Sequence, residues 1–120
     1  MKRTRLSLLA AVFLALLSVQ AQEPMTAVVE RGLSRAKHQA QFMANTLENT
    51  PDALPRTFEK GKLVTCKYNN WVSGFFPGVL WMLYEHSGDE DLRRQAELFT
   101  SRVEPARRMT NTHGLGFMLY

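Results

Sequence analysis

Apolar residues recur at helical spacing between Met25 and Asn49. The apolar positions in this segment lie three or four residues apart and are Val29, Leu33, Ala36, Ala40, Met43 and Leu47. This spacing places them on one face of an α-helix, so the pattern predicts a helix with one apolar side. The helix is expected to end at Asn49, because Pro51 cannot continue its hydrogen bonds and disfavours helical geometry in the preceding residue.

The next segment, residues 50–68, has no sustained hydrophobic period. It contains Pro51, Pro55, Gly61 and four basic side chains. Prolines and glycines without periodic apolar positions are typical of connecting segments on the protein surface. We therefore expect an irregular loop that could reach towards a pocket.

Two further helices are predicted after this loop. The first has Pro77 near its first turn, runs to His86, and should end at Gly88 in the left-handed conformation. Because it is apolar on nearly every side, we expect it to be buried. The second extends from Asp89 to about Val103, and the acidic residues at its start favour the amino end of a helix. Its inner face is predicted to hold Leu92, Ala96 and Phe99.

The short Ser87-Gly88 link predicts that these two helices are antiparallel neighbours, an αα-hairpin. Such hairpins are the units of helical toroids, in which an inner ring of helices faces the axis and an outer ring faces water. The carboxylates of Asp89 and Asp91 are interpreted as helix caps rather than as catalytic groups.

The first 21 residues resemble a secretory signal peptide. Three basic side chains precede an apolar run from Leu6 to Leu17, and Val19-Gln20-Ala21 supplies the small residues that a signal peptidase requires. A membrane anchor is the alternative, but a spanning helix needs roughly 20 apolar residues. We expect export to the periplasm or exterior of a bacterial cell, with a mature chain that begins at Gln22 and has no membrane span.

Length and charge limit the possible functions. A chain of 120 residues forms one small domain at most. Its net charge of +4 comes largely from Lys2, Arg3 and Arg5, so residues 22–120 are close to neutral and give no electrostatic case for binding nucleic acid. The three histidines and the single Cys66 lack the spacing of metal ligands, so no metal site is predicted. Cys66 is expected to be a small buried side chain rather than a reactive thiol.

The segment from Asn70 to Gly78 has features beyond those of a packed core. It contains two glycines, three aromatic residues and a proline within nine residues. Gly74 and Gly78 permit close backbone approach, and Trp71 offers a flat apolar face of the kind that stacks on a sugar ring. An aromatic core at a loop-to-helix junction is the alternative interpretation.

A second such segment runs from Thr110 to Phe117, where polar residues lead into two glycines. His113 in this segment could donate a hydrogen bond to a ligand, act as a general acid or base, or be a surface residue.

The order and spacing of these segments resemble glycoside hydrolase family 88, the unsaturated glucuronyl hydrolases. The resemblance implies an all-α fold, an (α/α)6 toroid of six helical hairpins with the active site at one mouth. Residues 22–120 would be its N-terminal part and would supply only the first helices. The matching blocks are Leu54-Pro55-Arg56, Trp71 to Gly78, Leu80 to Tyr84 with Ser87-Gly88-Asp89, and His113 with Leu115 to Met118.

The resemblance also implies an activity. This family removes the 4,5-unsaturated uronic acid from oligosaccharides made by polysaccharide lyases, by hydrating its vinyl ether double bond. It needs no cofactor, and Trp71 and His113 match family positions that contact the substrate. Of the two family aspartates, one directly follows the histidine, where this chain has Gly114, and the other lies beyond Tyr120. Both catalytic carboxylates are therefore absent, and we expect the chain to be inactive alone, since a positioned acid or base contributes about a hundredfold to ten-thousandfold in rate.

Three interpretations remain open at this point. The chain is a truncated piece of an ordinary family enzyme in which Gly114 is a substitution or a sequence error, a non-catalytic carbohydrate-binding remnant, or a structural helical remnant. In each case most neighbours of a toroid hairpin are missing, and neighbours cover the apolar faces of such repeats. We expect the following side chains to be exposed: Phe75, Trp81, Leu83 and Phe99.

Overall fold

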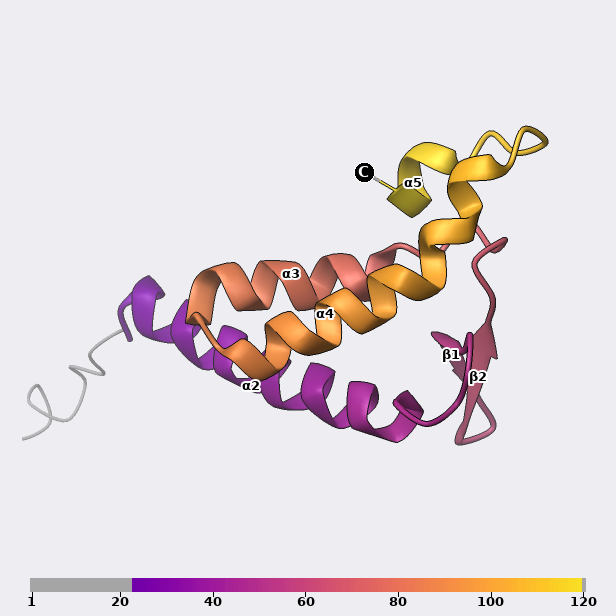
Figure 1. The fold of residues 1–120 in the computed structure, drawn as a ribbon. Helices are drawn as coiled ribbons and strands as arrows, with labels where there is room; N and C mark the ends of the chain where they lie inside the picture. Colours follow the sequence, from indigo (N-terminus) through magenta and orange to yellow (C-terminus); the bar gives the residue numbers. More distant parts are fainter. Residues whose placement is uncertain (1–22, 120) are drawn as a thin grey trace, which may run out of the picture. The chain divides into compact units, whose positions relative to one another are not determined.

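The computed structural model describes residues 23–119. The predicted signal peptide, residues 1–21, lies outside the described residues. The chain divides into two units, Met1–Glu30 and Arg31–Tyr120, and the packing described below belongs to the second. Among residues 23–119, no helix is both long and apolar enough to cross a membrane. The elements in chain order are α2 (Met25–Leu47), β1 (Leu54–Glu59), β2 (Lys62–Cys66), α3 (Phe75–Ser87), α4 (Glu90–Val103), the 3-10 helix η1 (Glu104–Arg108) and α5 (Leu115–Leu119) (Figure 1).

Helix α2 confirms the helix predicted from hydrophobic spacing, although it ends at Leu47 rather than Asn49. Ala40, Ala44 and Leu47 are buried on its inner face. Leu33, Ala36 and Met43 are partly buried against the same core. The apolar side of α2 is therefore a packing surface for the rest of the second unit.

The segment predicted to be an irregular loop contains an antiparallel β-hairpin instead. Its two-residue turn is formed by Lys60 and Gly61, whose φ angles of 49° and 75° lie in the left-handed region that hairpin turns require. The prediction was wrong because the pairing register is irregular between Pro55 and Thr57 and because Leu54 alone is buried on β1. An exposed and irregular strand leaves no alternating pattern in the sequence.

Helices α3 and α4 form the predicted αα-hairpin and lie side by side (Figure 1). Gly88 ends α3 in the left-handed conformation, with a φ of 66°, and its N–H donates to the Tyr84 carbonyl at 2.7 Å. Asp89 caps α4, where its carboxylate accepts a hydrogen bond from the Asp91 N–H at 2.9 Å. Both terminal signals in the sequence are thus confirmed.

The core lies where α2, α3 and α4 meet. Leu83 and Phe99, which we expected to be exposed, are 4% and 0% exposed because both lie inside the core that residues of α2, α3 and α4 form together. Conversely, α3 is not buried all round, since Val79 and Met82 are 43% and 70% exposed. The core residues of the hairpin are Leu80, Leu83, Leu92, Ala96, Phe99 and Val103.

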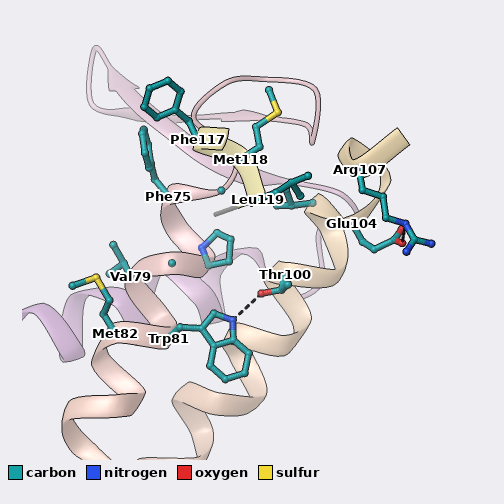
Figure 2. Close-up of a pocket in the computed structure, with 14 residues that line it drawn as sticks. Phe75, Val79, Trp81, Met82, Thr100, Glu104, Arg107, Phe117, Met118 and Leu119 are labelled. Atoms are coloured by element: carbon teal, nitrogen blue, oxygen red, sulfur yellow. Dashed lines mark hydrogen bonds and ion pairs between the residues drawn. The ribbon is translucent and has the colours of Figure 1, made fainter. Parts of the chain in front are cut away.

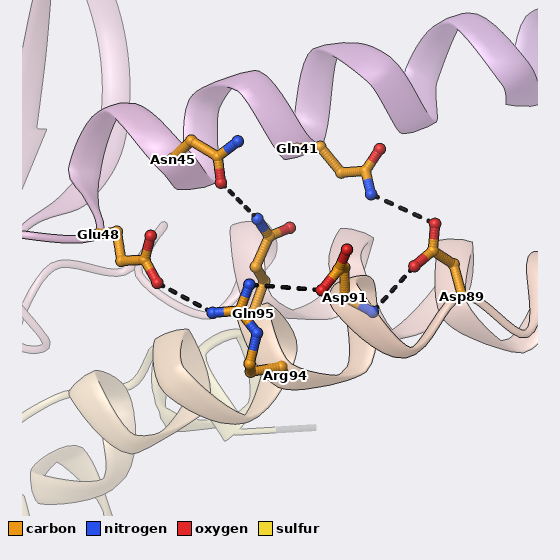
Figure 3. A network of polar contacts seen from close by, with 7 residues as sticks. All are labelled: Gln41, Asn45, Glu48, Asp89, Asp91, Arg94 and Gln95. Carbon is orange, nitrogen blue, oxygen red and sulfur yellow. Dashed lines mark hydrogen bonds and ion pairs between the residues drawn. The ribbon is translucent and has the colours of Figure 1, made fainter.

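Polar side chains align α2 with the start and middle of α4 (Figure 3). The Asp89 carboxylate lies 2.6 Å from the Lys37 ammonium and accepts a longer hydrogen bond from Gln41, at 3.4 Å. The hydrogen bond from Lys37 and the backbone N–H of Asp91 lower the pKa of Asp89. Further along the two helices, the Gln95 amide donates to the Asn45 side-chain oxygen at 2.8 Å. Asp89 therefore has a structural role as a cap and a link between helices.

Arg102, near the carboxyl end of α4, joins two earlier segments, the end of α2 and the residue before β1. It is 8% exposed and donates to the backbone carbonyls of Leu47, Glu48 and Ala53 at 2.8 to 3.1 Å. Its guanidinium also lies 4.3 Å from the centre of the Phe99 ring. Burial lowers the pKa of Arg102, and nearby carboxylates partly oppose this effect. The side chain thus satisfies the last carbonyls of α2 and fixes the segment that enters β1.

We expect Arg102→Met to lower the free energy of unfolding of the chain by about 2–4 kcal/mol, because several buried carbonyls would lose their donors. Arg107→Met is the matched control, since Arg107 is exposed and pairs with Glu104 three residues earlier in the sequence. An exposed pair of this kind contributes about 1 kcal/mol at most. Urea unfolding followed by circular dichroism measures both, and equal losses would contradict the assignment.

Candidate functional site

The two segments singled out in the sequence meet at Gly74 and Met118. A Cβ atom on Gly74 would overlap the Met118 carbonyl oxygen and would lie 2.6 Å from its carbonyl carbon and 2.7 Å from its Cα. Cβ atoms do not approach backbone this closely, so only glycine permits the contact. At Gly78, by contrast, an added Cβ atom would meet nothing within 4 Å. The close approach expected of the two glycines is made by Gly74 alone.

A second contact between the same segments joins Trp71 and Gly114. A Cβ atom on Gly114 would lie 3.4 Å from the Trp71 Cβ, 3.5 Å from the Thr112 hydroxyl oxygen and 3.7 Å from the Met118 Cε. These are ordinary van der Waals distances. The φ angle of Gly114 is not positive, so residues other than glycine can adopt its backbone conformation. Position 114 can therefore carry a side chain beside Trp71.

Short side chains shape the two loops locally. The Asn70 side-chain oxygen accepts from the Val72 N–H at 3.2 Å, and the buried Ser73 hydroxyl donates to the Tyr68 carbonyl at 3.0 Å. In the other loop, the Thr112 hydroxyl oxygen accepts from the Gly114 N–H at 3.1 Å. Local hydrogen bonds of this kind are how Ser, Thr and Asn stabilise turns.

Of the two predicted substrate contacts, Trp71 has the more defined surroundings. Its side chain is 59% exposed, and its indole ring lies 5.9 Å from the Phe75 ring at an angle of 88°. His113 lies in the turn before α5 and is exposed. In the structure, Trp71 thus lies beside position 114, and His113 is the neighbouring residue in the chain.

A cavity of about 640 Å³ lies between α3, the end of α4, η1 and α5 (Figure 2). Trp71 and His113 are not among its lining residues. At one point of the wall, the Trp81 indole N–H donates to the Thr100 hydroxyl at 3.0 Å. The apolar part of the lining includes Phe75, Val79, Met82, Val103, Phe117 and Leu119.

The chemistry of this cavity does not suit a sugar. Phe75, Val79 and Met82 are four and three residues apart on α3, which puts them in one exposed apolar stripe. A hydroxyl-rich ligand buried there would leave many polar groups unpaired. We therefore place the candidate sugar site at Trp71 and position 114, outside the cavity. Phe75 and Met118 line the cavity and also adjoin the candidate site.

Titratable groups elsewhere in the described part of the chain give no competing site. Within residues 23–119, no three His, Cys, Asp or Glu side chains gather into a cluster that could hold a metal ion. Cys66 is half-buried at the end of β2 and packs against the core. Burial raises the pKa of the Cys66 thiol, and the opposing effect of Arg56 is smaller. Its thiol therefore favours the protonated form, as expected for a structural cysteine.

Comparison with solved structures shows which known fold this arrangement resembles. No family model matches the chain. The crystal structure of an unsaturated glucuronyl hydrolase specific for heparin matches with a TM-score of 0.62 and 35% sequence identity, over 73% of this chain and 24% of that one. The fold is thus that of the helical-toroid glycoside hydrolases, and it is incomplete in this chain.

Two curated relatives support the same resemblance. The unsaturated glucuronyl hydrolase of Formosa agariphila is 39% identical over 51 residues, which are 42% of this chain and 13% of the relative. The unsaturated glucuronyl hydrolase of Bacillus sp. strain GL1 is 30% identical over 80 residues, 62% of this chain and 21% of the relative. The chain thus spans about a fifth or less of the curated relatives it matches. The resemblance to glycoside hydrolase family 88 is confirmed, and the chain is homologous to the unsaturated glucuronyl hydrolases.

Phe75, the partner of Trp71, was not among the site residues predicted from the sequence. The four-residue spacing between the two aromatic rings was the available signal, because side chains four apart meet where a helix begins. The contact between Gly74 and Met118 left no such signal, since it joins residues far apart in the chain.

We expect Gly74→Ala to lower the free energy of unfolding by about 1–3 kcal/mol, because α5 must shift to make room for the methyl group. Gly78→Ala is the matched control in the same segment. It should be neutral or stabilising by up to about 1 kcal/mol, since Gly78 lies inside α3 with open space around it. Chemical denaturation measures both, and equal effects of the two alanines would contradict the close approach.

Proposed function

We propose that these helices belong to a glycoside hydrolase that removes 4,5-unsaturated uronic acid from oligosaccharides made by polysaccharide lyases. The relatives are unsaturated glucuronyl hydrolases, which supports the reaction class. The observation that carries the proposal is the contact distance between Trp71 and position 114. In family 88 an aspartate follows the histidine, so this geometry supports a catalytic position directly beside a stacking surface.

In this proposal the exposed Trp71 indole packs against the apolar face of the uronate ring, and His113 donates a hydrogen bond to its polar groups. A carboxyl group then delivers a proton to the vinyl ether double bond and activates the water that adds to it. The resulting hemiketal collapses and releases the sugar. The reaction needs a carboxyl group whose pKa is tuned by burial and neighbours. Gly114 supplies none, so we propose that the chain is inactive by itself.

A second candidate function is carbohydrate binding without catalysis. It is favoured by one observation, namely that Trp71 remains exposed beside a position 114 that has no side chain. A stacking surface and a hydrogen-bond donor bind a sugar without a proton donor. The two candidates share the site and differ only in whether a carboxylate acts there.

The proposed location is outside the cytoplasm. The basic start, the apolar run and Val19-Gln20-Ala21 support a signal peptide that directs export to the periplasm or exterior of a bacterial cell. Oligosaccharides from secreted polysaccharide lyases would be available there.

We expect Trp71→Ala to weaken binding of an unsaturated uronic disaccharide to the 120-residue chain about tenfold or more, because the stacking surface is lost. Trp81→Phe is the control, since the Trp81 indole is hydrogen-bonded to Thr100 in the wall of the cavity and not in the candidate site. Isothermal titration calorimetry measures both affinities. Undiminished binding by Trp71→Ala would exclude Trp71 as the stacking residue.

We expect Gly114→Asp, made in the full-length continuation of this chain, to raise the rate of loss of absorbance from the unsaturated uronate about a hundredfold to ten-thousandfold. The aspartate should be accepted with little change in stability, since its Cβ meets neighbours at ordinary distances. Gly116→Asp is the control, because it adds the same carboxyl group two residues away, where a Cβ meets no atom within 4 Å. No gain from Gly114→Asp would favour the non-catalytic candidate.

A further inference from the structure

We infer that Phe75 is a positioning residue for Trp71, which holds the indole ring in the orientation that stacks on the sugar. The inference rests on the proposed function, because it gives Phe75 a role at the site through Trp71. The rings of Trp71 and Phe75 contact each other nearly perpendicularly, with centres 5.9 Å apart and an angle of 88°. Aromatic pairs favour this geometry over a face-to-face sandwich.

Trp71 needs such a partner because the core does not hold it. Its side chain is 59% exposed and lies in a turn, residues 71–74, rather than in a helix or strand. An exposed side chain in a turn samples several rotamers unless a neighbour restricts it. Near its Cβ, Trp71 meets a glycine, at position 114, which has no side chain to restrict the indole. The Phe75 ring is the aromatic contact found for the indole among residues 23–119.

The backbone that carries Phe75 is held by two contacts. It is the first residue of α3, and its N–H donates to the Val72 carbonyl at 3.2 Å. The residue before it is Gly74, which lies against the backbone of Met118. Figure 2 shows Phe75 and Phe117 at the same end of the cavity. The contact between segments thus sets the backbone position of Phe75, from which its ring packs edge-on against the indole.

The expected consequence is a difference in affinity. A ring that is already oriented loses less rotamer freedom when a ligand stacks on it. The interaction energy of an aromatic pair of this kind changes an equilibrium constant by a factor of about two to ten. Removal of the Phe75 ring should therefore weaken sugar binding by about two- to tenfold while Trp71 itself is retained.

The experiment uses the 120-residue chain with Trp81→Phe, so that Trp71 is the single tryptophan. Phe75→Leu removes the ring, Phe75→Tyr retains it, and Phe42→Leu is the control at an exposed phenylalanine of α2. Fluorescence anisotropy and the near-ultraviolet circular dichroism band of Trp71 report its order without ligand. Quenching of Trp71 fluorescence by an unsaturated uronic disaccharide reports binding.

We expect Phe75→Leu to lower the anisotropy and the circular dichroism band of Trp71 and to weaken binding by about two- to tenfold. Phe75→Tyr and Phe42→Leu should leave all three signals unchanged. If the Phe75→Leu variant loses the circular dichroism signal of its helices, the Phe75→Met variant replaces it in the experiment. Methionine keeps the apolar volume and lacks the ring. Unchanged tryptophan signals in the folded variant overturn the role of Phe75. If the parent chain does not bind the sugar, the proposed function is overturned instead. The anisotropy and circular dichroism of Trp71 without ligand test the role of Phe75 separately.

Discussion

The buried guanidinium of Arg102 is the interaction on which the fold of the second unit depends. Its donors satisfy carbonyls at the end of α2 and before β1, two segments about 50 positions earlier in the chain. Helix ends leave such carbonyls without partners, and water cannot supply them in a buried place. The same side chain lies over Phe99, so one residue couples the polar and apolar parts of the core. With α2 and α4 fixed in this way, α3 has a defined place to pack.

The site depends on a second constraint, the absence of a side chain at Gly74. Because its backbone can lie against Met118, the loop that carries Trp71 meets the loop that carries His113 and Gly114. The site is thus built from two loops that lead into α3 and α5, and the contact of Gly74 with the Met118 backbone in α5 holds them together. Loops placed on a rigid scaffold are where binding residues are commonly found.

The apolar cavity and the candidate site have different chemistry, although they adjoin at Phe75. The cavity wall on α3 repeats apolar residues at helical spacing, as expected of a helix that packs on further protein in a complete toroid. The site at Trp71 instead combines an exposed aromatic face with polar loop residues. A sugar has both apolar faces and hydroxyl groups, so it matches the second arrangement and not the first.

The sequence by itself determined the three long helices, the cap residues Gly88 and Asp89, and the family to which the chain is related. These features depend on local spacing and on residue types with strong conformational preferences, which a sequence displays directly. The β-hairpin, the burial of Phe99 and the charge of Arg102 in the core were decided by tertiary structure. So was the contact between Trp71 and position 114, because it follows from the fit of Gly74 against Met118. Contacts between residues far apart depend on how helices pack, and no local pattern records that packing.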